Sequence, residues 1–189
     1  TGGAGTYPFM VGLGYYTDQG FIVHQLFMRS PQDEQSLLSS LSSFLESFKV
    51  VVTFNGKSFD VPILNSRHVL NGVPSPLKKL RHIDLLHLSR RIWRNRLKDR
   101  SLGSLEVEIL ESTREQIEIP GWLVPQIYYD YLRSGDARPL EGVFYHNTID
   151  IISLAALMNY INNMLLYPIA ENNTEKALDM VALAQVFEK

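Results

Sequence analysis

A mixed α/β fold is predicted by the order of the sequence patterns, and three observations carry the prediction. Two apolar runs, residues 8–16 and 21–28, flank the turn residues Thr17-Asp18-Gln19-Gly20, which is the pattern of a β-hairpin. Residues 31–48 repeat apolar side chains at the 3.6-residue spacing of an amphipathic helix. The continuous β-branched run at 50–54 predicts a strand buried on both faces. This order favours one mixed sheet with at least one crossover connection.

Beyond residue 60 the pattern is mainly helical. A short strand is expected around His82-Ile83-Asp84, and Asp84 stands where it can cap the next helix. The expected helices cover residues 61–70, 85–97, a stretch beginning at 101, 124–132, about 140–165 and 173–187. With 189 residues, 45% of them hydrophobic, the chain is long enough for one domain with a substantial core.

Composition limits the function. The chain has no cysteine, which excludes disulfides and thiol chemistry within it. No run approaches 18 consecutive apolar residues, so we expect a cytoplasmic protein without a membrane partner. The net charge of −2 conceals an asymmetry, because residues 67–100 carry ten Lys/Arg against two Asp, and residues 101–189 carry five Lys/Arg against thirteen Asp/Glu. The basic stretch is either a footprint for phosphates or a solvated helix face that pairs with the acidic C-terminal part.

Asp60 follows the predicted strand at 50–54 after the strand-breaking pair Asn55-Gly56. A carboxylate just beyond the end of a buried strand lies where α/β folds build their sites. The alternative is that Asp60 only caps the helix that follows. His146 and Asp150 form a second candidate, since residues four apart share one face of a helix. Their alternatives are a hydrogen-bonded structural histidine and a cap or ion-pair carboxylate.

Together these motifs resemble a known family. The pattern Asn55-x-x-x-Phe59-Asp60 is similar to the second motif of DEDD 3′–5′ exonucleases, and His146-x-x-x-Asp150 to their third motif in its histidine form. Over residues 1–166 the chain resembles the bacterial YprB-type RNase H-like domain. The segments that carry this wider resemblance are the Gly-rich start at 2–14, His82-Ile-Asp-Leu85, Ser101-Leu-Gly-Ser-Leu-Glu106, Ile119-Pro-Gly121 and the stretch 146–154.

The resemblance implies an RNase H-like mixed sheet flanked by helices and a metal-dependent nuclease. The substrate would be single-stranded DNA or RNA, hydrolysed from its 3′ end with two Mg²⁺ or Mn²⁺ ions. By the resemblance, Asp60 and Asp150 are metal ligands and His146 is the general base. Asn55, Lys57 and Phe59 border the terminal nucleotide, with a core position as the alternative for Phe59.

Two features of the resemblance concern the ends of the domain. The family's first motif, Asp-x-Glu on the first strand, occurs nowhere in these residues, so we expect an RNase H-like domain at 1–166 that lacks its first strand. Residues 167–189 resemble the start of a tetratricopeptide-like helical region, which would offer a surface to a protein partner. The rival functions are a catalytically inactive RNase H-like module that binds nucleic acid or acts as a scaffold, and an α/β domain that binds proteins through its helices.

Overall fold

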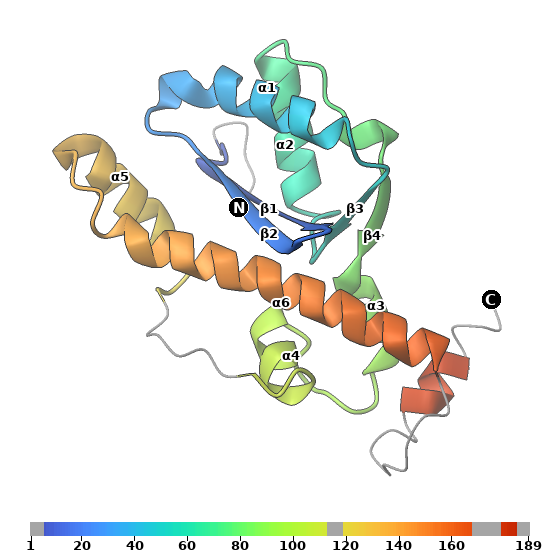
Figure 1. The fold of residues 1–189 in the computed structure, drawn as a ribbon. Helices are drawn as coiled ribbons and strands as arrows, with labels where there is room; N and C mark the ends of the chain where they lie inside the picture. The colour runs from blue at the N-terminus through green and yellow to red at the C-terminus, as the bar shows by residue number, and fades with distance from the viewer. Residues whose placement is uncertain (1–5, 113–118, 168–178, 185–189) are drawn as a thin grey trace.

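The computed structural model describes residues 6–112, 119–167 and 179–184, and it confirms the mixed α/β fold. Strands and helices alternate in the first half of the chain, and helices alone follow (Figure 1). The elements are β1 (Met10–Thr17), β2 (Gly20–Phe27), the 3₁₀ turn η1 (Pro31–Asp33), α1 (Glu34–Leu45), β3 (Val50–Thr53), α2 (Asp60–Leu70), the 3₁₀ turn η2 (Leu77–Lys79), β4 (Arg81–Asp84), α3 (Leu85–Ile92), α4 (Leu102–Glu108), α5 (Val124–Ser134) and α6 (Leu140–Leu166).

The strands form two separate sheets instead of the single mixed sheet that the sequence suggested. β1 and β2 are an antiparallel hairpin, as expected, in which Thr17 pairs with Gly20 across a two-residue loop. Gly20 has φ +132°, a conformation that glycine adopts without strain. β3 and β4 pair in parallel, and the chain between them crosses over through α2, whereas the helix at 31–48, from which a crossover was predicted, connects the two sheets. Within the described ranges, each strand therefore has hydrogen-bonded neighbours on one side only.

The strand β3 is less buried than the sequence predicted. Val50 is 41% exposed and the rest of the strand is only half-buried. The prediction of burial on both faces was wrong because β3 lines an open cleft, where no layer of side chains covers it. Within the part of the chain that the structure describes, β1 and β3 each have one edge without a strand neighbour, and both strands border this cleft.

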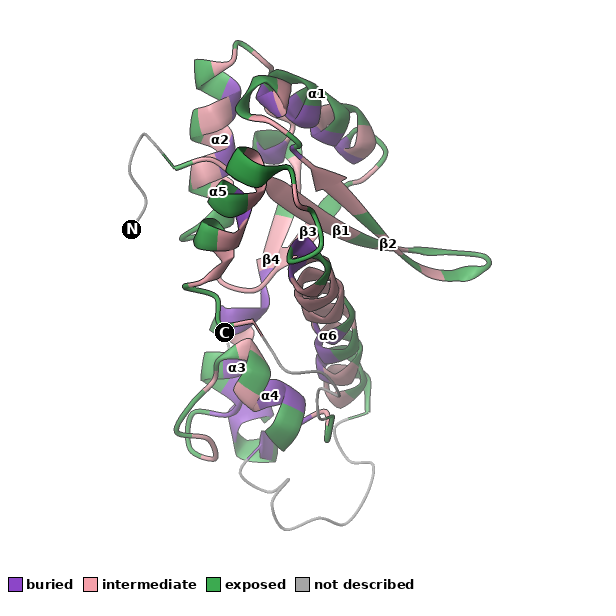
Figure 2. Ribbon diagram, turned by 90° about the vertical axis from the view of Figure 1, so that its left-hand side faces the viewer, coloured by how far each residue is buried: buried purple, intermediate pink, exposed green. Residues whose placement is uncertain are grey.

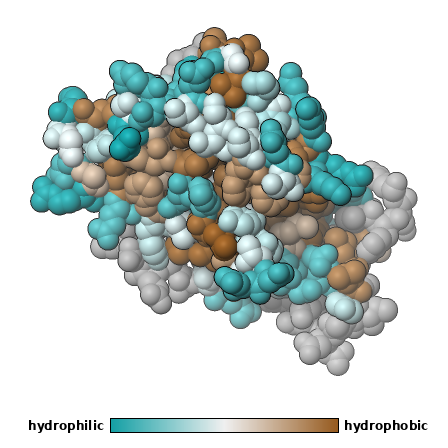
Figure 3. Space-filling view, turned by 45° about the horizontal axis from the view of Figure 1, so that its top comes forward, coloured by the Kyte–Doolittle hydropathy of each residue, from teal (hydrophilic) through white to brown (hydrophobic). Residues whose placement is uncertain are grey.

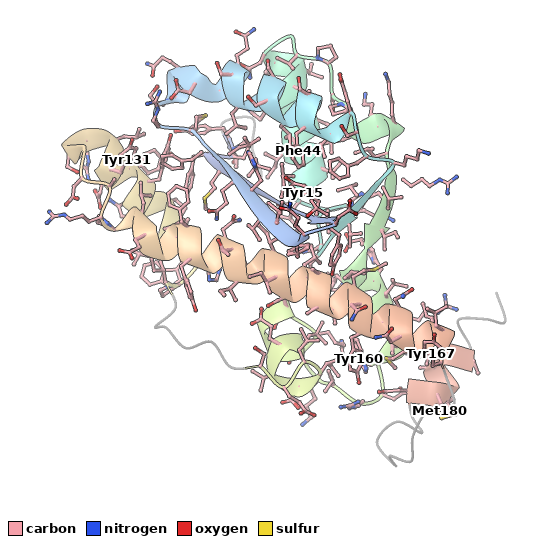
Figure 4. The ribbon with its side chains drawn as sticks, in the orientation of Figure 1. Tyr15, Phe44, Tyr131, Tyr160, Tyr167 and Met180 are labelled. Carbon is pink, nitrogen blue, oxygen red and sulfur yellow. The ribbon has the colours of Figure 1, made fainter. Side chains whose placement is uncertain are left out.

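Two apolar clusters hold the elements in place. In Figure 1 α4 lies below α6 and α3 passes behind it, and both pack against α6 through the buried Trp93, Leu105 and Leu157. Above it, α1 and α2 cover the hairpin, with Leu38 and Leu41 fully or almost fully buried. Figure 4 shows Tyr15 and Phe44 directed toward one another between hairpin and helix, with ring centroids 5.2 Å apart. In Figure 2 the buried residues (purple) gather in these two regions.

The helix α6 crosses the whole molecule and contacts both regions. It packs on β1, β2, α3, α4 and α5. By length and composition α6 is able to cross a membrane. In the structure α6 packs on the elements named above, and only a minority of its most apolar stretch is buried. That incomplete burial follows from its position, because one apolar side of α6 lines the open cleft.

Helix boundaries agree with the sequence except at α3. Ser101 caps α4 and Asp84 caps α3 at the predicted helix starts, and Gly135, with φ +74°, ends α5 two residues beyond the predicted end. However, α3 ends at Ile92 and not at residue 97, because the chain turns at the buried Trp93. Of the helix predicted at 173–187, residues 179–184 are helical and the remainder lies outside the described residues.

Candidate functional site

A cleft of about 1120 Å³ lies between the two apolar clusters, and we call it the main cleft. Its walls are β1, β3, α1, α2 and the middle of α6. Most of its lining is apolar, and in Figure 3 hydrophobic residues reach the surface across the middle of the molecule. Two carboxylates contribute to the lining, Asp60 from the start of α2 and Asp150 from α6. Two of the sequence-predicted site residues therefore line one cavity.

His146 lies beside Asp150 on α6. Its Nε2 is 3.4 Å from Asp150 Oδ2, the contact expected of residues four apart on a helix. Both side chains are partly exposed, at 29% and 37%. Both also line a smaller pocket of about 250 Å³, formed with residues 7–10 and the start of α5. Asp150 thus connects the smaller pocket with the main cleft.

Two glycines of β1 bring α6 close to the strand. A Cβ on Gly12 would lie 2.2 Å from Asn147 Oδ1, and one on Gly14 would lie 2.5 Å from Ile151 Cγ2. No side chain fits at either position, so α6 rests directly on the strand backbone. The amide of Gln25 then fastens the helix from β2, donating at 2.9 Å to both Asn147 Oδ1 and the Phe144 carbonyl. These contacts fix which face of α6 turns toward the cleft.

At the opposite wall, the buried carboxylate of Asp84 holds the loop that follows β3. Its Oδ1 accepts hydrogen bonds from Asn55 N at 2.7 Å and Leu86 N at 3.1 Å, and its Oδ2 accepts one from Lys57 N at 3.0 Å. Burial alone would raise the pKa of Asp84, but the three backbone N–H donors outweigh it and lower the pKa below its ordinary value. The loop also needs φ +64° at Asn55, a left-handed conformation that asparagine tolerates better than most residues. Asp84 therefore joins the end of β3 to the start of α3.

Asp60 follows this loop in the first turn of α2. Phe59 occupies the cap position and supplies no capping bond, whereas the Asp60 carboxylate in the first turn accepts a hydrogen bond from its own backbone N–H. The concave surroundings displace water from its carboxylate although the side chain keeps solvent access, and this desolvation raises its pKa. Its backbone N–H and His82 work against the rise, and the Asp84 carboxylate adds to it. A carboxyl whose pKa is raised in a cleft is typical of functional sites.

His82 is a polar neighbour that sequence reasoning did not assign to the site. Its Nε2 is 2.7 Å from Thr53 Oγ1 across the β3–β4 pair. Desolvation, and next the charge of Lys57, lower the pKa of His82, which favours a neutral imidazole. The alternation in His82-x-Asp84 was the available signal, because residues two apart on a strand face the same way. Both side chains act electrostatically on Asp60.

The remaining predicted residues differ in exposure. Lys57 is exposed at the loop surface, and Asn55 is half-buried. Phe59 is 52% exposed, which contradicts the alternative that placed it in the core. It is the residue before α2, where the chain enters the helix at the protein surface, so no element covers its ring. An exposed aromatic ring next to Asp60 is compatible with base stacking.

The donor chemistry of the cleft suits a divalent cation only in part. Aspartate oxygens are the ligands that Mg²⁺ prefers. Nevertheless, residues 6–112, 119–167 and 179–184 contain no group of three or more His, Asp or Glu side chains close enough together to hold a metal ion. Asp60 and Asp150 therefore form an incomplete ligand set.

Comparison with known proteins shows which superfamily has this sequence pattern. A family model described as the RNase H superfamily matches residues 1–162. The chain belongs to the RNase H superfamily. It is also 34% identical over 166 residues to the uncharacterized protein YprB of Bacillus subtilis (strain 168), in a match that covers 87% of this chain and 40% of that protein. The chain thus spans about two fifths of the length of the curated relative it matches. No solved structure matches it.

Membership in the superfamily agrees with the architecture and limits the classes of reaction that this site would catalyse. It agrees with small sheets flanked by helices and with the helical C-terminal part. At the level of the superfamily it suggests a nuclease-type activity on nucleic acid.

Proposed function

We propose that this protein is a metal-dependent nuclease that hydrolyses phosphodiester bonds of single-stranded DNA or RNA from the 3′ end. The observation that carries the proposal is that Asp60 and Asp150, which are distant in sequence, line one cleft, with His146 beside Asp150. Superfamily membership supports the reaction class. The direction of cleavage and the preference for single strands rest on the motif resemblance of residues 55–60 and 146–150.

The chemistry requires that negative charge be neutralised around the scissile phosphate. Two divalent ions, when bound about 3.5–4 Å apart, activate water and stabilise the leaving oxygen. Asp60 and Asp150 supply hard oxygen donors from opposite walls of the main cleft. In the proposal, further carboxylates come from an Asp-x-Glu strand outside residues 1–189. The main cleft has room for such a strand, since β1 and β3 both border it and, within the described residues, each has one edge without a strand neighbour.

In this scheme His146 removes a proton from the attacking water. An imidazole is suited to this task because its ordinary pKa lies near neutrality. The carboxylate of Asp150, 3.4 Å from Nε2, stabilises the imidazolium that forms. When the proton of the neutral ring is on Nε2 and points at Asp150, Nδ1 is the nitrogen that accepts the new proton. Lys57 and Phe59, both exposed beside Asp60, would hold the terminal nucleotide.

Replacement of His146 tests the proposal. In the full-length natural protein, His146→Ala should lower the hydrolysis rate about 10²–10⁴-fold while the fold is retained, because general-base assistance is lost. His24→Ala is a matched control, since His24 is an exposed histidine on β2. Turnover should be measured on 3′-blocked, 5′-blocked and circular single strands of DNA and RNA, with Mg²⁺, Mn²⁺ or EDTA. Unchanged turnover of His146→Ala would refute the assignment of His146 as the general base. Cleavage of circular strands would show that the protein acts as an endonuclease and not as an exonuclease.

A catalytically inactive RNase H-like module that binds nucleic acid is the second candidate. The absence of a complete ligand group from the described residues favours it. Calorimetry separates the two functions: a nuclease should bind Mn²⁺ in the main cleft, with affinity weakened by both Asp60→Asn and Asp150→Asn. The inactive module would be the correct function if the full-length protein binds single strands but neither binds metal nor hydrolyses the strands.

A further inference from the structure

Exposed basic side chains lie in two groups outside the main cleft, one at the start of β4 and the other in the last turn of α3 and just beyond it. Between residues 78 and 98 the chain carries eight Lys/Arg and one acidic residue, the buried Asp84. The positive charge at the surface is therefore almost unopposed within this segment. We call the exposed members the basic edge: Lys78, Lys79, Arg81, Arg90, Arg91, Arg94 and Lys98.

Packing forces these side chains outward. In α3 and the turn after it, Ser89, Ile92 and Trp93 are buried, and the intervening arginines are exposed. Figure 2 shows both exposed and buried residues on α3. At the other end of β4, Lys78 and Lys79 are exposed next to the buried Leu77. Figure 1 shows β4 leading directly into α3 along one side of the molecule, so the two groups share that side.

Pairing with the acidic C-terminal part explains only a part of this basic segment. Arg96, which is half-buried, forms an ion pair of 2.8 Å with the buried Asp179, as the pairing interpretation predicted. By contrast, the described ranges contain no ion-pair partner for Lys79, Arg81, Arg90 or Arg94. The dipole of α3 favours a cation in its last turn, but this effect does not reach the residues before β4.

The candidate site abuts the junction of β4 and α3, which lies between the two groups of the basic edge. Asp84 binds the backbone of Lys57 and caps α3, so the loop that leads to Asp60 abuts the start of α3. A strand whose end lies near Asp60 would leave the cleft past Lys57 and continue along α3. We propose that the basic edge binds the phosphate backbone of single-stranded nucleic acid, in a way that does not depend on base sequence. This inference rests on the proposed function for the position of the strand's end.

Salt dependence of binding tests the proposal, because each phosphate contact releases counterions. For single strands, the slope of log K against log salt changes by about 0.7 for each contact. Two double variants, Arg90→Gln/Arg94→Gln and Lys79→Gln/Arg81→Gln, remove two charges each at either end of the basic edge. Arg133→Gln/Arg138→Gln is the matched control. It also removes two charges, from residues 74% and 90% exposed in α5 and in the loop before α6.

Binding should be measured by fluorescence anisotropy on the full-length protein, with labelled oligo(dT) and oligo(rU) of about twenty nucleotides, longer than one typical binding site. EDTA prevents hydrolysis, so failure of the nuclease proposal does not affect this result. We expect both edge variants to reduce the slope by about 1.4 and the control to leave it unchanged. An equal change in all three variants, no change in the edge variants, or no binding by the wild-type protein would overturn the proposal. So would a salt-dependent self-association that the edge variants abolish without affecting nucleic-acid binding.

Discussion

Replacing Gly12 with alanine should destabilise the protein and displace the candidate site, because α6 rests directly on the backbone of β1. The new Cβ would lie 2.2 Å from Asn147 Oδ1 and 2.3 Å from Ile151 Cδ1, whereas ordinary contacts begin near 3.4 Å. Both neighbours must therefore retreat by about 1 Å. Both atoms are side-chain ends on successive turns of α6, so either both side chains rotate or the helix shifts away from β1.

The cost follows from two contributions. Overpacking of this kind typically costs about 1–3 kcal/mol. Movement of Asn147 also strains the 2.9 Å hydrogen bond from Gln25, which contributes about 1 kcal/mol. A total of about 2–4 kcal/mol should lower Tm by about 4–16 °C in a chain of this size. A displacement of about 1 Å at His146 should lower hydrolysis up to about 10²-fold.

Urea denaturation and thermal melts followed by circular dichroism measure the effect, with single-strand hydrolysis alongside. Gly103→Ala is the matched control, because Gly103 lies in α4 and no atom lies within 4 Å of the position that its new methyl group would take. That control should gain about 0.5–1 kcal/mol from the helix preference of alanine. If Gly12→Ala melts at the wild-type temperature and retains full hydrolysis, the close contact of α6 with β1 is not what positions the site.

Two further predictions concern carboxylates whose pKa values shift in opposite directions. Asp60→Asn should abolish hydrolysis and yet stabilise the fold at pH 7, because a pKa raised above 3.8 by desolvation means that folding disfavours the charged form. Urea titrations should show this gain fading as pH falls through the folded pKa and disappearing below the unfolded value of 3.8, where Asp60 is protonated in both states. Asp84→Asn should destabilise the fold at pH 7, because the lowered pKa of Asp84 means that its charged carboxylate stabilises the folded state. In the wild-type protein this stabilisation is present above the unfolded pKa of 3.8 and is lost as pH falls through the lower pKa of the folded state. The same titration series measures both, and a loss for Asp60→Asn or a gain for Asp84→Asn would contradict the electrostatic description of this wall.

Local signals in the sequence were sufficient for most elements, because hairpin turns, caps and apolar spacing act over a few residues. The loop before Gly20 and the cap at Ser101 are examples. The separation of the strands into two sheets was not predictable in this way, since a β-branched run such as residues 50–54 does not reveal how many neighbours a strand has. The same limit applies to the site. Spacing indicated His146 and Asp150, whereas His82 approaches Thr53 through parallel pairing between distant segments.

The unbroken length of α6 gives it the properties of a lever. Its far half is clamped in the apolar cluster through Leu157 and Ile161, and its near half carries His146 and Asp150. At 1.5 Å per residue, Asp150 lies about 16 Å along the axis from Ile161. A tilt of about 4° at the clamped end that displaces Asn147 and Ile151 from β1 would swing the carboxylate by about 1 Å, a displacement sufficient to impair the proposed catalysis. Substitutions in the apolar cluster between α6 and the helices α3 and α4, remote from any substrate, should therefore change the rate of turnover before they measurably lower the stability of the fold.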